Sequence, residues 1–335
     1  MAAIYIREQG VMLTKVGERL CAVKGRKTLL DRPVFGIDSI ALFGNVQVSA
    51  QALTMLMEHG VTVSYFSYGG NYLGQTGADS SKNIFLRMQQ YDCYMDPIKR
   101  NELAAIIVSN KIRNQLTVIE KWNWKDNFDW KTDYYEIEKN LYKVHDKNGQ
   151  LEFMGIEGIC SNIYFHSFGH MFSCDFEFEK RSRRPPKNPI NVILSLGYTL
   201  LTKEVASVLE AESFETYMGF LHGIRYGRKS LALDIVEEFR QPVVDRLTLK
   251  LFNKGLIGKY DFEFPEGGTV ILTEEGFKKY CRAYERWLTG ADSAAGDKNF
   301  RGRIREQAAH LKDAIRKNEI YRPYSWKDHY VCDQL

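Results

Sequence analysis

The spacing of apolar residues changes near residue 80, and this change limits the folds that the chain can adopt. Before it, short runs of β-branched and aromatic residues alternate with turn residues, a pattern typical of strands. The glycine-rich segment 68–77 lacks the Gly-Lys-Ser/Thr ending of a phosphate-binding loop, so we interpret it as a hairpin and linker. We expect strands at 4–7, 11–15, 19–23, 39–43 and 61–66, and one helix at 48–57.

After residue 80 the apolar residues follow a helical spacing. Residues 122–149 form either a helical hairpin or an insertion, and residues 254–274 have strand–turn–strand character. The sequence therefore predicts an α+β protein: a small N-terminal β-rich domain (1–78) followed by a larger all-helical domain (79–335). Helices are expected to about residue 94, from residue 97 onward, and over 191–210, 277–288 and 300–318.

The composition is that of an ordinary globular protein, with 44% hydrophobic and 26% charged residues among 335. The net charge is only +4, so the total charge does not point to nucleic acid. The six cysteines form no CxxC pair, which fits reduced thiols in the cytosol. The chain has no signal-peptide core and no apolar run long enough to cross a membrane, so we expect a cytoplasmic protein without membrane contact.

The segment 219–240, Gly-Phe-Leu-His-Gly-Ile-Arg-Tyr-Gly-Arg-Lys-Ser-Leu-Ala-Leu-Asp-Ile-Val-Glu-Glu-Phe-Arg, places an imidazole before a short helix that carries acids. Ser230 can cap this helix. Asp234 and Glu237 are three residues apart and share one face, so we expect both to point into a space where His222 can meet them. An imidazole with carboxylate oxygens suits Mg²⁺ or Mn²⁺. An exposed acidic face with a satisfied histidine is the alternative.

A further acid, Glu157, is predicted in the first turn of another helix. The helix dipole favours an acid there. It does not explain Gly155 and Gly158, which are poor helix formers and allow another backbone to approach closely. These glycines favour a functional role for Glu157.

The densest positive run covers residues 180–187, where prolines prevent a helix. A charge run is usually a solvated face. This one lies between the two candidate acidic segments, and arginine binds phosphate well. We therefore expect Arg183 and Arg184 to contact DNA.

Two more arginines, Arg225 and Arg228, lie between His222 and Asp234. Positive charge beside an acidic metal site is expected if a phosphodiester binds there. Without a metal and a phosphate, the same residues would only neutralise the carboxylates. We predict that Arg225 and Arg228 contact DNA.

The sequence contains other histidines that could form a site. His166 and His170, four residues apart, could bind zinc, but nothing else completes that site, so we interpret both as structural. His222 and Arg225 have the His-x-x-Arg spacing of tyrosine recombinases, with Tyr260 downstream as a nucleophile that needs no metal. That alternative leaves the three acids unexplained.

The motifs stand in a fixed order along the chain: Gly-Ile-Glu157-Gly, the run Arg-Arg-Pro-Pro-Lys-Asn-Pro, Asn191 followed by Leu-Gly-Tyr, Gly-Phe-Leu-His222, and Ser-Leu-Ala-Leu-Asp234-Ile-Val-Glu237-Glu-Phe-Arg. Over the whole chain they resemble the CRISPR-associated integrase that captures new spacers, the larger subunit of the CRISPR adaptation complex. The resemblance implies a catalytic Mg²⁺ or Mn²⁺ site built from Glu157, His222 and Glu237, with Asp234 close by as a helper.

The resemblance also implies an activity and an assembly. The family inserts short foreign DNA as new spacers by 3′-hydroxyl transesterification. With water as nucleophile the site would be a nuclease, or a resolvase on branched DNA. The family forms homodimers, and two dimers clamp a small ferredoxin-like subunit in a heterohexamer on double-stranded prespacer and repeat DNA. The number of metal ions stays open, and a DNA-architectural scaffold is the non-enzymatic alternative.

Overall fold

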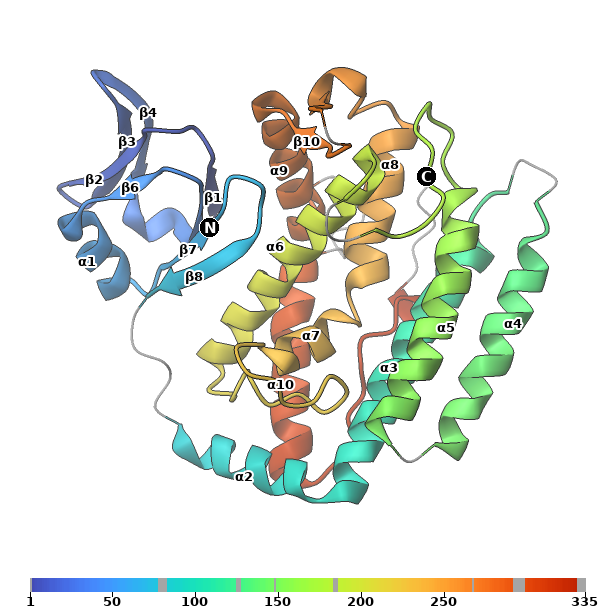
Figure 1. Cartoon of the computed structure of the whole chain (residues 1–335). Coiled ribbons are helices and arrows are strands. Elements are labelled where there is room, and N and C mark those ends of the chain that lie inside the picture. The colour runs from blue at the N-terminus through green and yellow to red at the C-terminus, as the bar shows by residue number, and fades with distance from the viewer. Residues whose placement is uncertain are drawn as a thin grey trace. The chain divides into compact units, whose positions relative to one another are not determined.

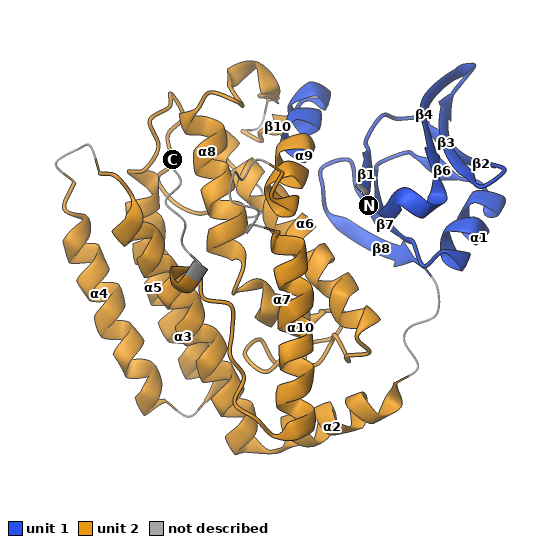
Figure 2. Cartoon of the chain, turned by 180° about the vertical axis from the view of Figure 1, so that it is seen from behind, with its two compact units in different colours: residues 1–80, 273–281 blue, residues 81–272, 282–335 orange. Residues whose placement is uncertain are grey.

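The computed structural model describes residues 2–77, 83–124, 128–147, 149–182, 186–266, 268–291 and 299–329 (Figure 1). The chain divides into two compact units (Figure 2). Residues 1–80 and 273–281 form the first unit, and residues 81–272 and 282–335 form the second.

A four-stranded sheet with the order β1-β5-β7-β8 forms one part of the first unit. The first three strands are parallel, and β8 is antiparallel to β7, which gives the hairpin expected in the glycine-rich segment. Parallel neighbours need a crossover, and α1 lies in the connection between β5 and β7. The elements are β1 (Ala2–Ile6), β5 (Ile37–Phe43), β7 (Thr62–Phe66), β8 (Tyr72–Thr76) and α1 (Ala50–Glu58).

A second sheet has the order β4-β3-β2-β6. Its strands are β2 (Met12–Val16), β3 (Arg19–Lys24), β4 (Lys27–Pro33) and β6 (Gln47–Val48). Strand β4 was not expected from the sequence. It is an edge strand, and all its residues but one are exposed, so it has no alternation of apolar and polar residues to reveal it.

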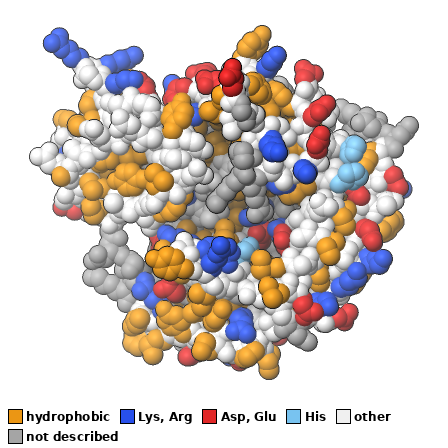
Figure 3. All heavy atoms as spheres, in the orientation of Figure 1, with side chains coloured by type: hydrophobic (Ala, Val, Ile, Leu, Met, Phe, Trp, Pro, Cys, Tyr) orange, Lys and Arg blue, Asp and Glu red, His pale blue; other side chains and the backbone are white. Residues whose placement is uncertain are grey.

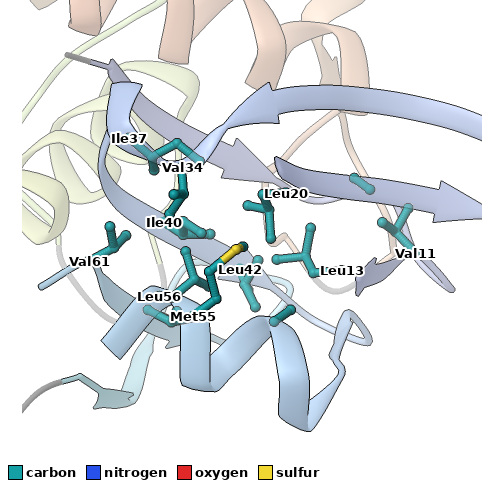
Figure 4. Close-up of a cluster of buried hydrophobic side chains, with 13 residues drawn as sticks. Val11, Leu13, Leu20, Val34, Ile37, Ile40, Leu42, Met55, Leu56 and Val61 are labelled. Carbon is teal, nitrogen blue, oxygen red and sulfur yellow. The ribbon is translucent and has the colours of Figure 1, made fainter. Parts of the chain in front are cut away.

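The core of the first unit lies between the two sheets and α1 (Figure 4). Ile40 and Leu42 of β5 are two residues apart and point to the same side of the sheet. Met55 and Leu56 of α1 meet them, because both lie on one face of that helix. Each of these four side chains is at most 1% exposed. Burial of such a side chain contributes about 1.5–3 kcal/mol, so this cluster stabilises the unit far more than local propensity does.

Helices make up most of the second unit, and together with the strands of the first unit they confirm the α+β fold class. They are α2 (Ile84–Met95), α3 (Pro97–Lys121), α4 (Trp130–Tyr142), α5 (Gln150–Gly169), α6 (Pro189–Ala211), α7 (Ser230–Val236), α8 (Arg246–Asn253), α9 (Glu274–Thr289, which begins in the first unit) and α10 (Phe300–Lys317). The strand–turn–strand prediction is met by the antiparallel pair β9 (Phe262–Glu263) and β10 (Ile271–Leu272). Helices α3, α4 and α5 lie side by side (Figure 1).

Helix α3 carries polar residues into the interior. It begins where the sequence predicts, because Asp96 accepts hydrogen bonds from the first-turn amides and Pro97 follows it. Toward its middle the buried residues are polar as well as apolar: Ser109, Asn110, Lys111, Asn114 and Gln115. Polar groups are rarely buried without partners, so this part of α3 must face a polar site.

Helix α6 corrects one expectation. By length and composition alone it could cross a membrane, whereas the sequence was expected to contain no such run. Half of its most apolar window is buried inside the protein. It packs against α7, α8 and α10, so its apolar side chains are part of the core of the second unit.

The chain between α7 and α8 forms a π-helical turn, η3 (Arg240–Asp245). Pro242 lies in it and has no N–H to donate, which explains the interruption that the sequence predicted at this residue. The turn begins three residues after Glu237; Asp245 in it is fully buried, and Arg240 is half-buried.

Candidate active site

Glu157 lies in the middle of α5, not in its first turn, because the helix already begins at Gln150. The hydroxyl of Ser161, one turn later, donates to Oε1 of Glu157 over 2.8 Å. Apart from the backbone of the helix itself, no described atom lies within 4 Å of the place where a Cβ would stand on Gly155 or Gly158. The glycines therefore leave open space beside Glu157. The close approach of another backbone, which the sequence suggested, is not found among the described residues.

The loop before α7 is folded around the carboxylate of Asp234. Its Oδ2 accepts the amide protons of Phe220 (2.5 Å) and Leu221 (3.0 Å), and its Oδ1 accepts that of His222 (2.9 Å). A Cβ on Gly219 would stand 2.8 Å from Oδ2, so only glycine fits there. Asp234 is fully buried and its carboxylate is occupied by the loop. It does not point into an open metal-binding space, as was expected from its place on the helix.

Asp234 also fixes the orientation of His222. The Nδ1 atom of His222 lies 2.8 Å from Oδ1 of Asp234. An ionised carboxylate can only accept, so Nδ1 is the donor, and in the neutral imidazole the lone pair is on Nε2. That Nε2 lies 3.9 Å from Oε1 of Glu237. The imidazole is thus held with its free nitrogen toward the second acid.

Glu237 follows the last residue of α7 and is 2% exposed. Positive groups surround its carboxylate. The Lys111 Nζ atom lies 2.6 Å from Oε2, and Nη2 of Arg240 lies 3.4 Å from Oε1. Ser230, expected as the helix cap, is instead the first residue of α7, and it accepts a hydrogen bond from Arg228 Nε over 3.1 Å.

Lys111 was not anticipated from the sequence. It comes from α3, is 3% exposed, and forms ion pairs with both Glu157 and Glu237. A lysine in this position could have been suspected only from the run of polar residues in the middle of a long, otherwise apolar helix. The site therefore combines α3, α5, the loop 219–229 and the end of α7.

The electrostatic surroundings keep both glutamates ionised. Burial acts to raise the pKa of Glu157, but the charge and hydrogen bond of Lys111 and the hydroxyl of Ser161 outweigh it and lower that pKa to about 2. Burial also opposes ionisation of Glu237, and the charges of Arg240 and Lys111 again lower its pKa below the usual value. At neutral pH both side chains are carboxylates.

The donor set fits a hard divalent cation in its chemistry. Two carboxylates and a neutral imidazole nitrogen are ligands that Mg²⁺ and Mn²⁺ accept. Oε2 of Glu237 is buried and, apart from its ion pair with Lys111 at 2.6 Å, has no hydrogen-bond partner among the described residues. Among the described ranges, no group of three or more His, Cys, Asp or Glu side chains is already arranged to hold a metal. Lys111 occupies the space between the two acids.

Comparison with known proteins assigns the family. Residues 4–286 match the family model described as CRISPR associated protein Cas1. The chain belongs to the Cas1 family. Over 287 residues it is 34% identical to a CRISPR-associated endonuclease Cas1 of Thermus thermophilus, covering 85% of this chain and 84% of that protein.

Solved structures agree with this assignment. A Cas1 protein from Thermotoga maritima matches with a TM-score of 0.83 at 27% identity, covering 96% of this chain and 99% of that one. A chain of a Cas6-RT-Cas1–Cas2 complex matches with a TM-score of 0.81 at 26% identity, covering all of this chain and 36% of that one. These matches confirm the family indicated by the motifs, and with it a DNA endonuclease and integrase of CRISPR adaptation.

The arginines expected to contact DNA differ in their surroundings. Arg183 and Arg184 lie outside the described residues. Arg225 is exposed on the loop after His222. Arg228 is used within that loop, because its guanidinium donates to the carbonyl oxygen of His222. On the face shown in Figure 3 acidic and basic side chains are interspersed.

The alternative histidine sites find no support in the geometry. Tyr260 is 98% exposed in the 3-10 turn η4 (Lys259–Asp261), while His222 faces Asp234 and Glu237. Nδ1 of His166 lies 2.8 Å from Asp133. The ring of His170 stacks on Phe128, with centroids 3.9 Å apart. His166 and His170 thus have the structural contacts expected of them.

Proposed function

We propose that this Cas1-family chain joins the 3′-hydroxyl ends of short DNA fragments to the CRISPR repeat at a divalent metal site formed by Glu157, His222 and Glu237. The observation that carries the proposal is the convergence of these three side chains from separate elements: Lys111 pairs with both glutamates, and Nε2 of His222 lies 3.9 Å from Oε1 of Glu237. Their ionised oxygens and the free imidazole nitrogen are suitable ligands for Mg²⁺ or Mn²⁺.

The chain's own residues would hold and orient the reacting groups. Glu157 and Glu237 would bind the cation through oxygen, and His222 through Nε2. Asp234 would take part by keeping the proton on Nδ1 of His222. A bound divalent ion would polarise the scissile phosphate and make the attacking hydroxyl easier to deprotonate.

The reaction itself exchanges one phosphodiester for another. The 3′-oxygen of the incoming fragment forms a bond to the phosphorus of the repeat, and the bond from that phosphorus to the 3′-oxygen of the cut strand breaks. The attacking hydroxyl loses a proton and the leaving oxygen gains one. Because one phosphodiester bond forms for each one that breaks, no external energy source is required. With water as nucleophile the same site would hydrolyse DNA, which agrees with the endonuclease name of the curated relative.

DNA would be held by arginines near the site. We propose that Arg225, exposed beside His222, contacts the phosphate backbone directly. Arg183 and Arg184 are proposed as a second contact on their sequence alone. We propose Arg228 as a further DNA contact, although part of its guanidinium already supports the loop.

The assembly is proposed on the same basis. Residues 1–78 would form the dimerisation domain of a homodimer, and residues 79–335 the catalytic domain. Two dimers would hold a small ferredoxin-like subunit in a cytoplasmic heterohexamer with double-stranded prespacer and repeat DNA. The support is that one solved relative is a chain of a complex that contains Cas2.

A strand-transfer assay tests the function. Labelled DNA with 3′-hydroxyl ends is incubated with a supercoiled plasmid carrying a leader and repeat, the partner subunit, and either Mn²⁺ or EDTA. Glu157→Gln is compared with Glu152→Gln, a matched change at an exposed glutamate of the same helix.

We expect metal-dependent joining by the wild type and by Glu152→Gln, and none by Glu157→Gln. Joining that survives EDTA would contradict the metal site and favour a tyrosine nucleophile. A folded wild-type protein that cleaves branched DNA but never joins would be a nuclease or resolvase. One that binds DNA without either reaction would be a scaffold.

A further inference from the structure

Lys111 stands where the two acidic ligands of the proposed metal site face each other. It is 3% exposed, and its Nζ pairs with Oε1 of Glu157 and Oε2 of Glu237. We propose that Lys111 is a resident cation: it holds the two carboxylates together before the divalent ion binds, and it is displaced from between them when the ion arrives. This inference rests on the metal site of the proposed function.

The two glutamates need a shared positive charge when no metal is bound. Ionised side chains are buried only when they are paired, and two carboxylates directed at one place repel each other. Arg240 does not fill this role. Among the described residues its ion pair is with Glu237 and not with Glu157, on which its charge acts from farther away, and its guanidinium lies over the ring of Tyr198 at 4.8 Å. Of the ion pairs that the two acids form within the described ranges, only that of Lys111 joins both.

The ammonium and a divalent ion would compete for the same oxygens. Lysine carries a compact point charge, which resembles a small cation more than the planar guanidinium does. An ion bound by Glu157 and Glu237 would repel an ammonium that stayed between them. The geometry therefore allows either cation in that place, but not both.

An acceptor for the displaced ammonium lies one turn further along α3. The hydroxyl of Ser161 donates to Glu157, so it must accept from Nε2 of Gln115, which lies 3.0 Å away. That arrangement fixes the amide orientation and leaves Oε1 of Gln115 buried without a hydrogen-bond partner. Residues four apart on a helix are neighbours, so Lys111 can turn toward this oxygen without leaving the interior.

Metal affinity and metal-free stability test the inference without any DNA reaction. The dissociation constant of Mn²⁺ is measured by the electron paramagnetic resonance of free Mn²⁺, and the melting temperature by circular dichroism in EDTA and in Mn²⁺. Lys111→Met removes the charge and keeps the length, whereas Lys111→Arg keeps the charge. Lys121→Met, at an exposed end of the same helix, is the matched control.

Lys111→Met should bind Mn²⁺ at least about tenfold more tightly than the wild type, because no resident cation has to be displaced. In EDTA it should melt about 5 °C or more below the wild type, because the two acids lose their shared partner. Mn²⁺ should restore most of that loss. Lys111→Arg should bind Mn²⁺ no more tightly than the wild type, and Lys121→Met should change neither quantity.

The inference would be overturned if the wild type binds Mn²⁺ and folded Lys111→Met binds it no more tightly. The proposed function would then remain intact. In that case Lys111 would support the bound metal instead of competing with it. Absence of Mn²⁺ binding by the wild type would overturn both. The joining assay tests the proposed function separately from the inference about Lys111. Joining should be lost in Glu157→Gln and in EDTA, whichever role Lys111 has.

Discussion

The Nδ1 atom of His222 lies 2.8 Å from Oδ1 of Asp234, and the backbone N–H of His222 donates to the same oxygen over 2.9 Å. One buried carboxylate therefore fixes both the backbone and the ring of the histidine. The residues between them and before α7, 223–229, form the loop that carries Arg225 and Arg228, so the shape of this loop and the direction of the imidazole are set together.

Asp234→Asn should lower the rate of strand transfer by about 10–100-fold, which is typical for the loss of a group that orients a metal-binding histidine. The amide keeps one acceptor oxygen but puts an NH₂ where the loop amides and Nδ1 of His222 need an acceptor. The initial rate of joining and the Mn²⁺ affinity measure the effect. Asp146→Asn, at an exposed aspartate, is the control. A rate within about twofold of the wild type, with the histidine still in place, would show that orientation by Asp234 is unimportant.

Two arginines of the same loop should behave differently. Arg225→Gln should weaken DNA binding and reduce the slope of log affinity against log salt by about one, as expected for one lost phosphate contact. Arg228→Gln should reduce stability by about 1–3 kcal/mol, because the carbonyl of His222 and the hydroxyl of Ser230 lose a donor. Fluorescence anisotropy over a salt series and thermal melts separate the effects. Equal salt slopes for Arg225→Gln and the wild type would exclude the phosphate contact.

The fold was largely predictable because most elements carry their own pattern. The apolar stripe of α6, the Asp96-Pro97 start of α3 and the alternation in β5 are all local signals. The elements that were misplaced or missed have no such local sequence signal. Edge strand β4 is mostly exposed, and α5 begins at Gln150 after Gly149, without a side-chain cap. The position of Glu157 within its helix was therefore wrong.

The candidate metal ligands could be named from the sequence, but the positive charges around them could not. Glu157, His222 and Glu237 stand in recognisable motifs, and the structure brings them together. The direction of Asp234 depends on loop amides, which no side-chain pattern reports. Lys111 is distant in sequence from both acids it pairs with, so only the packing of α3 against α5 reveals it.

The buried aspartate of η3 should make stability depend on pH. Asp245 accepts hydrogen bonds from the hydroxyls of Tyr164 (2.9 Å) and Tyr198. Burial raises its pKa from the ordinary 3.8 to about 6, against the opposing effect of these hydrogen bonds and of nearby arginines. At a pH between these two pKa values, Asp245 is protonated in the folded protein and ionised in the unfolded chain. This contribution to stability is complete below pH 3.8 and is lost as pH rises through about 6.

Asp245→Asn should remove this dependence. The free energy of unfolding of the wild type minus that of the variant should fall by roughly 2–3 kcal/mol between pH 4 and pH 7, at about 1.4 kcal/mol per pK unit. Urea unfolding at several pH values, in EDTA, measures it. Asp146→Asn provides the comparison for an exposed aspartate. A difference that stays constant over this range, or rises with pH, would contradict the raised pKa.

The segment after α10 is held by the same helix that carries Lys111. Oδ1 of Asn114 accepts the amide proton of Trp326, and its Nδ2 donates to the carbonyl of Glu238, both over 3.0 Å. The carboxylate of Glu238 in turn accepts the amide proton of Tyr324 over 2.7 Å. Residues 321–326 are thus bonded to the side chains of Asn114 and of Glu238, the residue next to the proposed metal ligand Glu237.

Asn114→Ala should therefore destabilise the second unit and loosen this segment. Two buried backbone groups lose their partners, at about 1–3 kcal/mol each. Urea unfolding gives the free energy, and hydrogen exchange at the Trp326 amide reports the segment, which should exchange at least about tenfold faster. Asn123→Ala, an exposed change just after the same helix, should do neither. Unchanged protection of the Trp326 amide in a destabilised variant would show that other contacts hold the segment. Loss of protection together with slower joining would show that the segment helps to position Glu237.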